Sequence, residues 1–574
     1  MKLFNTPVSQ AVGAALLLAS GAASAYVPTS NTDGAVTLYW GGATASSLSA
    51  QELTIAAVCV TNAHLAYVPT SATNRAPGND WAVACETNSS KVAGLPASPN
   101  TRVLVVKRDR GGSGVGVGPV QTKAIDSNSG RITFLAVNGT NCVAGVDTPG
   151  TNGAPNILLG GTAVPLLTCG ASYTFNAYAE IGTSDIEPDK FFGINTPDVD
   201  GTLIPFRSEN DRAFAELNSL ATLAFNIPAS KPLRDDLQAI QFPASSVCHP
   251  SNAGYNSATS ITTDRDDATN AESEACMPSL TRAEINSMLT GKILSWDQLD
   301  ASLVDASADN GVKVCRRVNG SGSQATANAL VGSFPCDPNL ADGTSNIIQP
   351  LPHDGTYVIA GSGSSNVATC LDTFGDNNQY AIGILSVEGR NVDNSASYRF
   401  IKIDGVAPTL RNIHAGDYWF WAQQSCQRRN ANLPYNVDAG RPSDTIQNKD
   451  RVFDALCGPA ATNGLNGVPS LTKLNGPVNA ANCKAGTNPG ANCGSVYTWG
   501  QSGWLSTPTT SLIYDNVLTT ALVSGLTTYP RPVNGYTREV ALGRPNICQS
   551  AVKSDFGANG SRGTIVAPNP NWTP

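Results

Sequence analysis

The sequence predicts a mixed α/β protein with two lobes, disulfide-rich insertions and a C-terminal extension. Segments typical of strands alternate along the chain with segments typical of helices, and this alternation predicts sheets covered by helices. The 574 residues exceed the length of a typical single domain, so two or more compact units are expected. Fourteen cysteines, many of them about 10 to 30 residues apart, predict mostly local disulfides, and their pairing stays open.

Two early segments each place a turn of small residues directly after a predicted strand. In GAVTLYWGGATASSLSAQELTIAAVCV an alternating segment leads through residues 41–47 into a helical pattern. A second strand at residues 103–106 is rich in β-branched side chains and precedes Gly-Gly-Ser-Gly at residues 111–114. Turns of this kind point unpaired backbone N–H groups outward, so each is a candidate seat for an anion.

Later segments continue the alternation. YAEIGTSDIEPD places Asp185 just after Gly182-Thr183-Ser184, where an Asx turn or a helix cap is the alternative to a binding role. Thr281 and Glu284 predict a capping box at the start of a helix, which Gly291 can end. A buried strand is expected at residues 379–389, followed by a strand, a turn and an aromatic-rich segment.

The stretch CRRVNGSGSQATANAL places Arg317 three residues before a hydroxyl-rich turn that opens a predicted helix. A helix N-terminus leaves up to four backbone N–H groups without partners and attracts anions, and an arginine adds a planar fork of donors. The sequence GSGS occurs again at residues 361–364 with no arginine before it, so a plain solvated turn is the alternative.

The first 25 residues predict a secretory signal peptide. Lys2 precedes an apolar core at residues 11–19, and Ala-Ser-Ala at residues 23–25 fits a cleavage site, so the mature chain is expected to begin at Tyr26. The product is then periplasmic or secreted. No later apolar run approaches the roughly 20 residues that span a bilayer, and no membrane anchor is expected.

Charge and histidine content narrow the function classes. The formal net charge of -8 argues against nucleic acid as a partner, because bulk positive charge is missing. Four scattered histidines, with no HExxH spacing and no CxxC pair, argue against a metal site, and no cofactor is expected. An anionic ligand would have to be held by local donors.

Taken in order, these segments resemble the phosphate-specific periplasmic substrate-binding proteins of the PstS type, in islands between residues 36 and 426. GGATAS is similar to the family's GAT turn, GGSGVGV to its GSGxGI loop, IGTSDIEP to its FGASDAP loop and RVNGSGS to its RxDGSGT loop. LTRAEINSMLTGKILSWDQL is similar to the helix-plus-tryptophan segment before the family's arginine loop. The resemblance implies a type II periplasmic-binding-protein-like fold, phosphate uptake and an ABC permease as a partner.

Carried over residue by residue, the resemblance also implies a binding site for inorganic phosphate or a related oxyanion. One side would be formed by Thr44, the backbone N–H of Ala45 and Ser113, and Asp185 would accept a hydrogen bond from a proton of the ligand. The full set is Thr44, Ala45, Ser113, Asp185, Arg317, Ser321, Gly322 and Ser323. Asn319 stands where the family has an aspartate that pairs with the arginine, so Arg317 is expected to be held differently.

The residue types make chemical sense without the family. Hydroxyl and backbone N–H dipoles saturate the lone pairs of an oxyanion while one arginine supplies charge. An ionised Asp185 is only an acceptor, so it favours an anion that carries a proton, such as phosphate, over sulfate. No catalytic residue is expected, because a phosphate-ester hydrolase needs an activated nucleophile or a metal pair and Ser321 has no obvious histidine base.

The predicted lobes follow from the order of these segments. We expect the first lobe in residues 26–207, the second in 208–388, a return to the first in 389–426, and a Cys-, Gly- and Asn-rich extension packed on the first lobe in 427–574. An insertion with Cys142 and Cys169 separates Ser113 from Asp185. The alternative function is an extracellular structural or adhesive protein on the same scaffold, with a vestigial or repurposed cleft.

Overall fold

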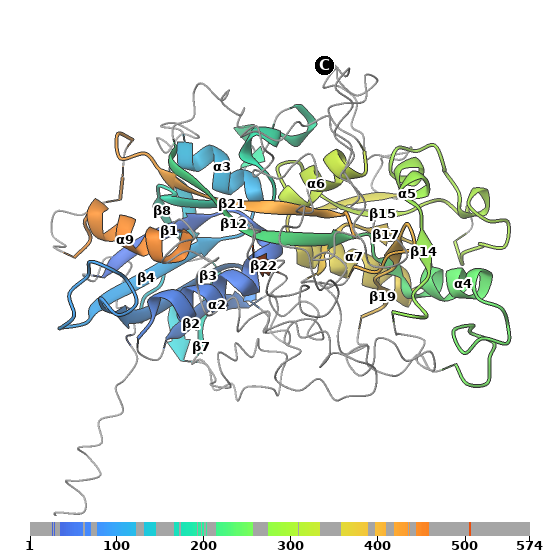
Figure 1. Cartoon of the computed structure of the whole chain (residues 1–574), viewed down its shortest axis with the longest axis horizontal. Helices are drawn as coiled ribbons and strands as arrows, with labels where there is room; N and C mark the ends of the chain where they lie inside the picture. The colour runs from blue at the N-terminus through green and yellow to red at the C-terminus, as the bar shows by residue number, and fades with distance from the viewer. Residues whose placement is uncertain are drawn as a thin grey trace, which may run out of the picture.

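The computed structural model describes residues 26, 28, 35–60, 63–69, 77–121, 131–144, 166–171, 174–191, 193–196, 198–199, 202–203, 214–255, 274–307, 309–332, 357–387, 396–408, 418–433, 435–436, 443–457 and 504–506. The predicted signal peptide and most of the predicted C-terminal extension lie outside these residues. Within them the chain forms two main sheets with helices packed against them (Figure 1), and the predicted α/β class is confirmed.

Among the described residues, the larger sheet has eleven strands. In order they are β18 (Leu385–Ser386), β12 (Phe214–Asn226), β21 (Trp421–Arg429), β9 (Ile181–Ser184), β1 (Val36–Gly41), β4 (Thr101–Arg108), β3 (Pro77–Thr87), β2 (His64–Pro69), β7 (Leu166–Cys169) and β6 (Cys142–Ala144), with β22 (Trp504–Ser506) paired to β12. β1 runs parallel to β4 and to β9. The carboxyl ends of these three strands therefore meet at one edge, where ligands of α/β sheets commonly bind.

The smaller sheet has five strands in the part of the chain that the structure describes. In order they are β16 (Val358–Gly361), β15 (Val314–Arg317), β17 (Ile382–Gly383), β13 (Ala229–Ser230) and β19 (Tyr398–Arg399). β15 runs parallel to β16 and to β17. Two-stranded pairs complete the described strands: β5 (Ile132–Leu135) with β8 (Thr174–Ala177), β10 (Asp198–Val199) with β11 (Thr202–Leu203), and β14 (Ser279–Leu280) with β20 (Lys402–Ile403).

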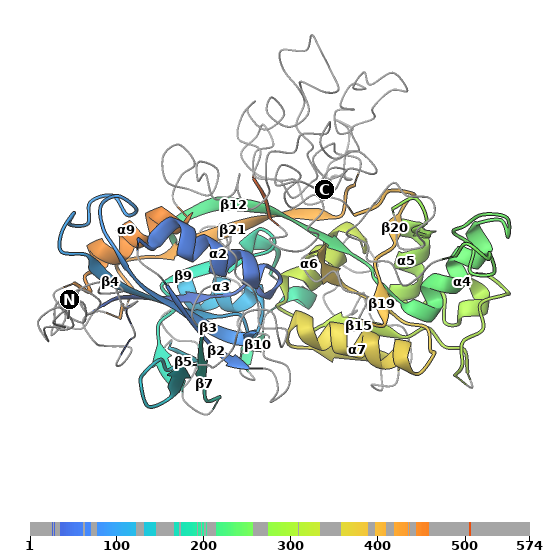
Figure 2. The ribbon, with the colours of Figure 1, turned by 90° about the horizontal axis from the view of Figure 1, so that it is seen from below.

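Helices cover both sheets. The α-helices are α2 (Ser47–Val58), α3 (Ser113–Gln121), α4 (Lys231–Gln241), α5 (Arg282–Leu289), α6 (Gly322–Leu330), α7 (Ser364–Asp376) and α9 (Ile446–Cys457), and the 3-10 turns are η1 (Thr44–Ser46), η2 (Pro188–Lys190), η3 (Gly193–Asn195) and η5 (Trp296–Gln298). Figures 1 and 2 show α2, α3 and α9 beside the larger sheet, and α4, α5 and α7 with the smaller one.

Alternate residues of the central strands face two different cores. On β1, Leu38 and Trp40 join the core that holds α2 and α9, whereas Tyr39 joins the core on the other face. α3 lies on that other face with its backbone very close to the sheet, since a Cβ added at Gly116 would stand 2.2 Å from the carbonyl oxygen of Thr183. The glycines of GGSGVGV therefore serve close helix-to-strand packing.

Two long strands join the two sheets. β12 pairs antiparallel with β21 inside the larger sheet, and Figure 1 shows both strands running toward the smaller sheet. β12 leads directly into β13 of that sheet, and β21 follows Phe420, which packs against Phe225. Among the described residues, β12 and β21 therefore both connect the two sheets, and the chain passes between them again from β17 to β18.

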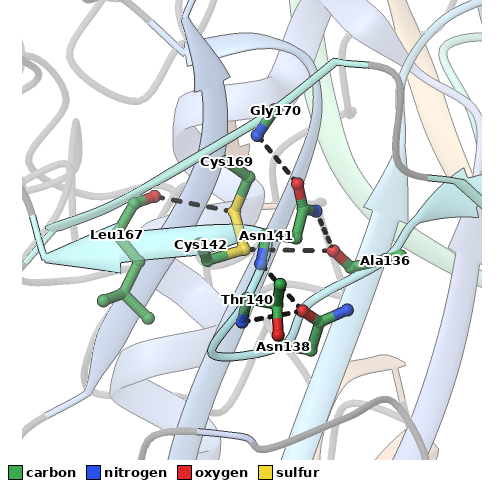
Figure 3. Close-up of a disulfide and its surroundings, with 8 residues drawn as sticks. All are labelled: Ala136, Asn138, Thr140, Asn141, Cys142, Leu167, Cys169 and Gly170. Atoms are coloured by element: carbon green, nitrogen blue, oxygen red, sulfur yellow. Dashed lines mark hydrogen bonds between the residues drawn. A yellow bond between two sulfur atoms is a disulfide. The ribbon is translucent and has the colours of Figure 1, made fainter.

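The insertion between α3 and β9 is tied by a disulfide. Cys142 of β6 and Cys169 of β7 are bonded and lie opposite each other at the end of the larger sheet (Figure 3). Beside them the Asn141 side chain accepts a hydrogen bond from the Gly170 backbone N–H at 3.0 Å and donates one to the carbonyl of Ala136. The insertion thus extends the sheet at its far edge.

Five disulfides occur among the described residues, and they are mostly local, as predicted. They join Cys59 to Cys85, Cys142 to Cys169, Cys248 to Cys276, Cys315 to Cys370 and Cys426 to Cys457, with separations of 26, 27, 28, 55 and 31 residues. The other cysteines lie outside the described residues.

Two further predictions meet the structure. The capping box of Thr281 and Glu284 is present at the start of α5, and Gly291 follows the end of that helix at a φ of 67°. The strand predicted at residues 379–389 is buried but divided, because β17 pairs within the smaller sheet and β18 pairs with β12. No helix among the described residues combines the length and the apolar character that crossing a membrane requires.

Candidate functional site

The turn after β1 places Thr44 at the edge where β1, β4 and β9 end. Ala43 adopts a left-handed conformation with a φ of 55°, and Thr44 then begins η1. The Thr44 hydroxyl donates to the carbonyl of Asp109 at 2.7 Å and so ties this turn to the turn after β4.

A buried lysine, Lys107, holds the same turn in place. Lys107 donates to the carbonyl of Gly42 and forms an ion pair with Asp109. Its ammonium lies 5.4 Å from the ring centre of Trp40 and 5.9 Å from that of Trp81. The positive charge is therefore neutralised locally while it remains close to the site.

Ser113 and Asp185 meet at the ends of β4 and β9. Ser113 is the first residue of α3, and its hydroxyl accepts a hydrogen bond from the Asp185 backbone N–H at 3.0 Å. Asp185 is 1% exposed, and its Oδ1 accepts a hydrogen bond from Nε2 of Gln424 at 2.9 Å. Asp185 does not cap η2, whose N-cap is Glu187.

Burial controls the ionisation of Asp185. Loss of water around the carboxyl raises its pKa above the ordinary value, whereas the hydrogen bond from Gln424, the charge of Arg317 and the hydroxyl of Ser113 act in the opposite direction. Burial lowers the pKa of Arg317 to about 10, and the charge of Asp185 acts against that shift. Arg317 therefore stays charged near neutral pH.

The arginine turn belongs to the smaller sheet. Arg317 ends β15, Ser321 caps α6 by accepting a hydrogen bond from the Gln324 backbone N–H, and Gly322 and Ser323 are the first residues of the helix. Arg317, Ser321 and Ser323 are each 1% exposed, which excludes a solvated turn. The Ser323 hydroxyl is buried and has no hydrogen-bond partner among the described residues.

Arg317 is held by the second GSGS turn. Its guanidinium donates to the carbonyls of Gly361 at 3.2 Å and Ser362 at 2.8 Å, and to the hydroxyl of Ser364 at 3.2 Å. This contact exists because β15 and β16 are parallel neighbours, so the turns after them lie side by side. Asn319 instead accepts a hydrogen bond from Arg316 at 2.8 Å, so Arg317 is held without a carboxylate at that position.

The two sheets touch at this site. Nη2 of Arg317 donates to the Thr44 hydroxyl at 3.2 Å, and the Gly114 backbone N–H donates to the carbonyl of Gly320 at 2.7 Å. A Cβ added at Gly322 would stand 2.2 Å from the Ser113 hydroxyl and 2.8 Å from Oδ2 of Asp185. The structure therefore brings Thr44, Ser113, Asp185, Arg317, Ser321 and Gly322 together, with Ala45 and Ser323 adjacent in sequence.

Three features of the site were not predicted from the sequence. Gln424 lies in a strand whose sequence, WAQQSCQRR, contains three glutamines, and nothing marks one of them as a partner of Asp185. The second GSGS turn has the same sequence as the first, but no arginine precedes it, so the sequence did not mark it as part of the site. Lys107 directly follows the predicted strand, and only its presence in an apolar run could have indicated burial.

Comparison with known proteins gives distant structural likeness only. No protein-family model matches the chain, and no curated protein sequence does. The chain is similar to a protein of Clostridium perfringens described as a phosphate ABC transporter substrate-binding protein and solved with bound phosphate, at 14% identity and a TM-score of 0.32 over 73% of this chain and 93% of that one.

Two further solved structures give lower scores. An ABC-type phosphate transport receptor from Vibrio cholerae is 14% identical with a TM-score of 0.22, over 43% of this chain and 75% of that one. PstS from Borrelia burgdorferi is 12% identical with a TM-score of 0.21, over 43% and 74%. These identities and TM-scores do not identify a ligand, so the evidence for the ligand is taken from the residues of the site.

Proposed function

We propose that this chain is a two-lobed binding protein for inorganic phosphate, or for a similar oxyanion that carries a proton, and that the ligand lies where the two sheets meet. The observation that carries the proposal is the convergence of buried donors from both sheets around one buried carboxylate. Arg317 comes from the smaller sheet, and Thr44, Ser113 and Asp185 come from the larger one.

The donors suit an oxyanion. Arg317 supplies the charge, the hydroxyl of Ser113 supplies a neutral dipole, and the start of α6 adds backbone N–H groups. The Thr44 hydroxyl donates to the carbonyl of Asp109 and would turn its hydrogen toward the ligand on binding. The buried Ser323 hydroxyl supports this role, because a buried polar group without a partner costs about 1 to 3 kcal/mol. A ligand that accepts its hydrogen bond would remove that cost.

Asp185 supports selectivity for a protonated anion. Its ionised carboxylate accepts a hydrogen bond from an anion that still carries a proton and repels one that does not. Phosphate near neutral pH carries such a proton, and sulfate does not. The charges of Arg317 and Lys107 act on this carboxyl and favour its ionised form.

Uptake is the role that fits a protein of this kind, with an ABC permease as its partner. We place the division between the lobes in β12 and β21, which run from one sheet to the other. The ranges expected from the sequence, 208–388 for the second lobe and 389–426 for the return, stay predictions. The disulfides suit the oxidising compartment that the predicted signal peptide implies.

Binding without catalysis is the activity we propose. Ser321 uses its hydroxyl to cap α6, and no histidine contacts it among the described residues. In the same part of the chain, no group of three or more His, Cys, Asp or Glu side chains is placed to hold a metal ion.

Isothermal titration calorimetry of the oxidised mature protein, stripped of bound ligand, tests the proposal with phosphate and separately with sulfate at pH 7. We expect one-to-one phosphate binding and, at the same anion concentrations, no detectable sulfate binding, so the weaker sulfate constant has to be measured at higher concentration. Arg317→Ala should weaken phosphate binding by about 2 to 5 kcal/mol, the cost of truncating one partner of a buried charged pair. Arg428→Ala, which removes an ion pair between β21 and α9, is the control and should bind as the wild type does.

The contrary result is equally informative. A folded, ligand-free wild-type protein that binds neither anion would refute the proposal and favour a structural or adhesive role for the scaffold. Equal affinity of the wild type and Arg317→Ala would show that phosphate binds elsewhere.

A further inference from the structure

Gln424 lies beside Asp185 on the strand that joins the two sheets. β21 runs antiparallel to β9 with Ser425 opposite Ser184, which brings Gln424 next to Asp185 just beyond the end of β9. Gln424 is fully buried, and its Nε2 donates to Oδ1 of Asp185 at 2.9 Å. The amide therefore reaches the one carboxylate of the site from outside the predicted ligand-binding turns.

The two oxygens of Asp185 have different surroundings. Oδ1 receives the amide hydrogen of Gln424. Oδ2 lies toward the start of α6, 2.8 Å from the position that a Cβ at Gly322 would take. A proton on Oδ1 would face the amide hydrogen, so the amide disfavours protonation there and leaves Oδ2 to meet the ligand.

We propose that Gln424 is a specificity-determining residue, which keeps Asp185 a hydrogen-bond acceptor and directs its Oδ2 toward the ligand. The inference rests on the proposed function, because it assigns the choice between protonated and unprotonated anions to a pair of residues. Gln424 acts through Asp185, so it is a positioning residue and need not touch the ligand.

The electrostatic surroundings agree with this role. Burial favours the neutral form of Asp185, and a neutral carboxyl can donate a hydrogen bond as well as accept one. The charged groups that act on it are Arg317 from the smaller sheet and Lys107 from β4, and Ser113 contacts it from α3. Loss of the Gln424 amide would therefore raise the pKa of Asp185 further and weaken its rejection of sulfate.

The test is the ratio of sulfate to phosphate dissociation constants at pH 7 for the wild type and Gln424→Met, which has a similar length but no amide. We expect the ratio to fall at least tenfold in the variant. As the pH is lowered, the loss of discrimination should begin at a higher pH than in the wild type. A role in stability alone would not move either quantity.

Gln427→Met is the matched control. Gln427 lies three residues further along β21, is equally buried and donates to the carbonyl of Gly116 instead of to Asp185. It should lower stability by a similar amount and leave the ratio and its pH profile unchanged.

Gln424→Leu keeps the proposal testable if the methionine variant does not fold. It also removes the amide hydrogen from Oδ1 of Asp185, so relative sulfate affinity should rise. Unchanged selectivity in a folded Gln424 variant that still binds phosphate would overturn the inference and leave the proposed function intact. Absence of phosphate binding in the wild type would overturn both.

Discussion

Gly322→Ala tests whether the start of α6 faces the larger sheet as described. The new methyl group would lie 2.6 Å from Cβ of Asp185, whereas ordinary contact begins at 3.4 Å, so α6 and Asp185 must separate by about 0.8 Å. The Ser113 hydroxyl can rotate away, but the Asp185 Cβ is fixed by its backbone. The helix itself accepts alanine, because alanine has a higher helix propensity than glycine.

The separation breaks the contacts that cross the site. The bond from Gly114 N–H to the Gly320 carbonyl would lengthen from 2.7 Å to about 3.5 Å, and that from Arg317 to Thr44 from 3.2 Å to about 4.0 Å. A neutral bond contributes about 1 kcal/mol and a charged one about 1.5 to 3 kcal/mol. The closed arrangement therefore loses about 2.5 to 4 kcal/mol, which is roughly 70- to 1,000-fold in phosphate affinity.

Calorimetric titration measures the affinity, and small-angle scattering without ligand should show a larger radius of gyration than in the wild type. The melting temperature should change little, since the clash is confined to the contact of the start of α6 with Ser113 and Asp185. Gly139→Ala is the control, because a Cβ there would meet nothing within 4 Å. Unchanged affinity and unchanged dimensions in Gly322→Ala would refute the described contact between α6 and Asp185.

Three further predictions concern stability. Burial raises the pKa of Asp185, so the stability of the fold depends on the ionisation of this carboxyl. Its stabilising contribution is complete below the ordinary pKa of an aspartate and is lost as the pH rises through the pKa in the folded protein. The Asp185→Asn variant should therefore be more stable than the wild type at pH 7. Denaturation at pH 7 and pH 4 should show this difference shrinking in acid, and a constant difference would contradict it. Lys449→Met should lower the free energy of unfolding, measured in urea, by about 3 to 5 kcal/mol, because Lys449 lies 2.7 Å from Glu180 and 3.1 Å from Asp444 in a buried cluster. Lys231→Met removes a partly exposed ion pair and should lower it by under about 1 kcal/mol. Replacing Cys426 and Cys457 together by serine opens a closed loop of 31 residues and should lower the free energy of unfolding by about 3 to 4 kcal/mol. If the variant and the wild type unfold at the same urea concentration, this disulfide does not constrain the unfolded chain.

Local signals predicted much of the fold and part of the site. The turns that hold Thr44 and Ser113 were predicted because a glycine-rich segment follows each predicted strand within a few residues. The capping box of Thr281 and Glu284 was predicted because its hydrogen bonds lie within one helical turn. These features depend on neighbouring residues, which a single sequence displays.

Features that depend on sheet register could not be predicted in the same way. The approach of Gln424 to Asp185 requires β21 to pair antiparallel with β9 across 239 residues of chain. The hydrogen bonds of Arg317 to the second GSGS turn require β15 and β16 to be parallel neighbours. The repeat of GSGS, which made the first turn look less specific in the sequence, is therefore the segment that holds Arg317. No local pattern specifies pairings over such separations.

The anchoring of the two connecting strands has a mechanical consequence. β12 carries β22 along residues 221–223, and β21 is fixed at Cys426 by its disulfide to α9, which in turn is held by Lys449 and Glu180. A rotation of one sheet relative to the other must then bend the short stretches between these anchors and the smaller sheet. Gln424 lies within one of them, so the same bending would swing its amide away from Asp185.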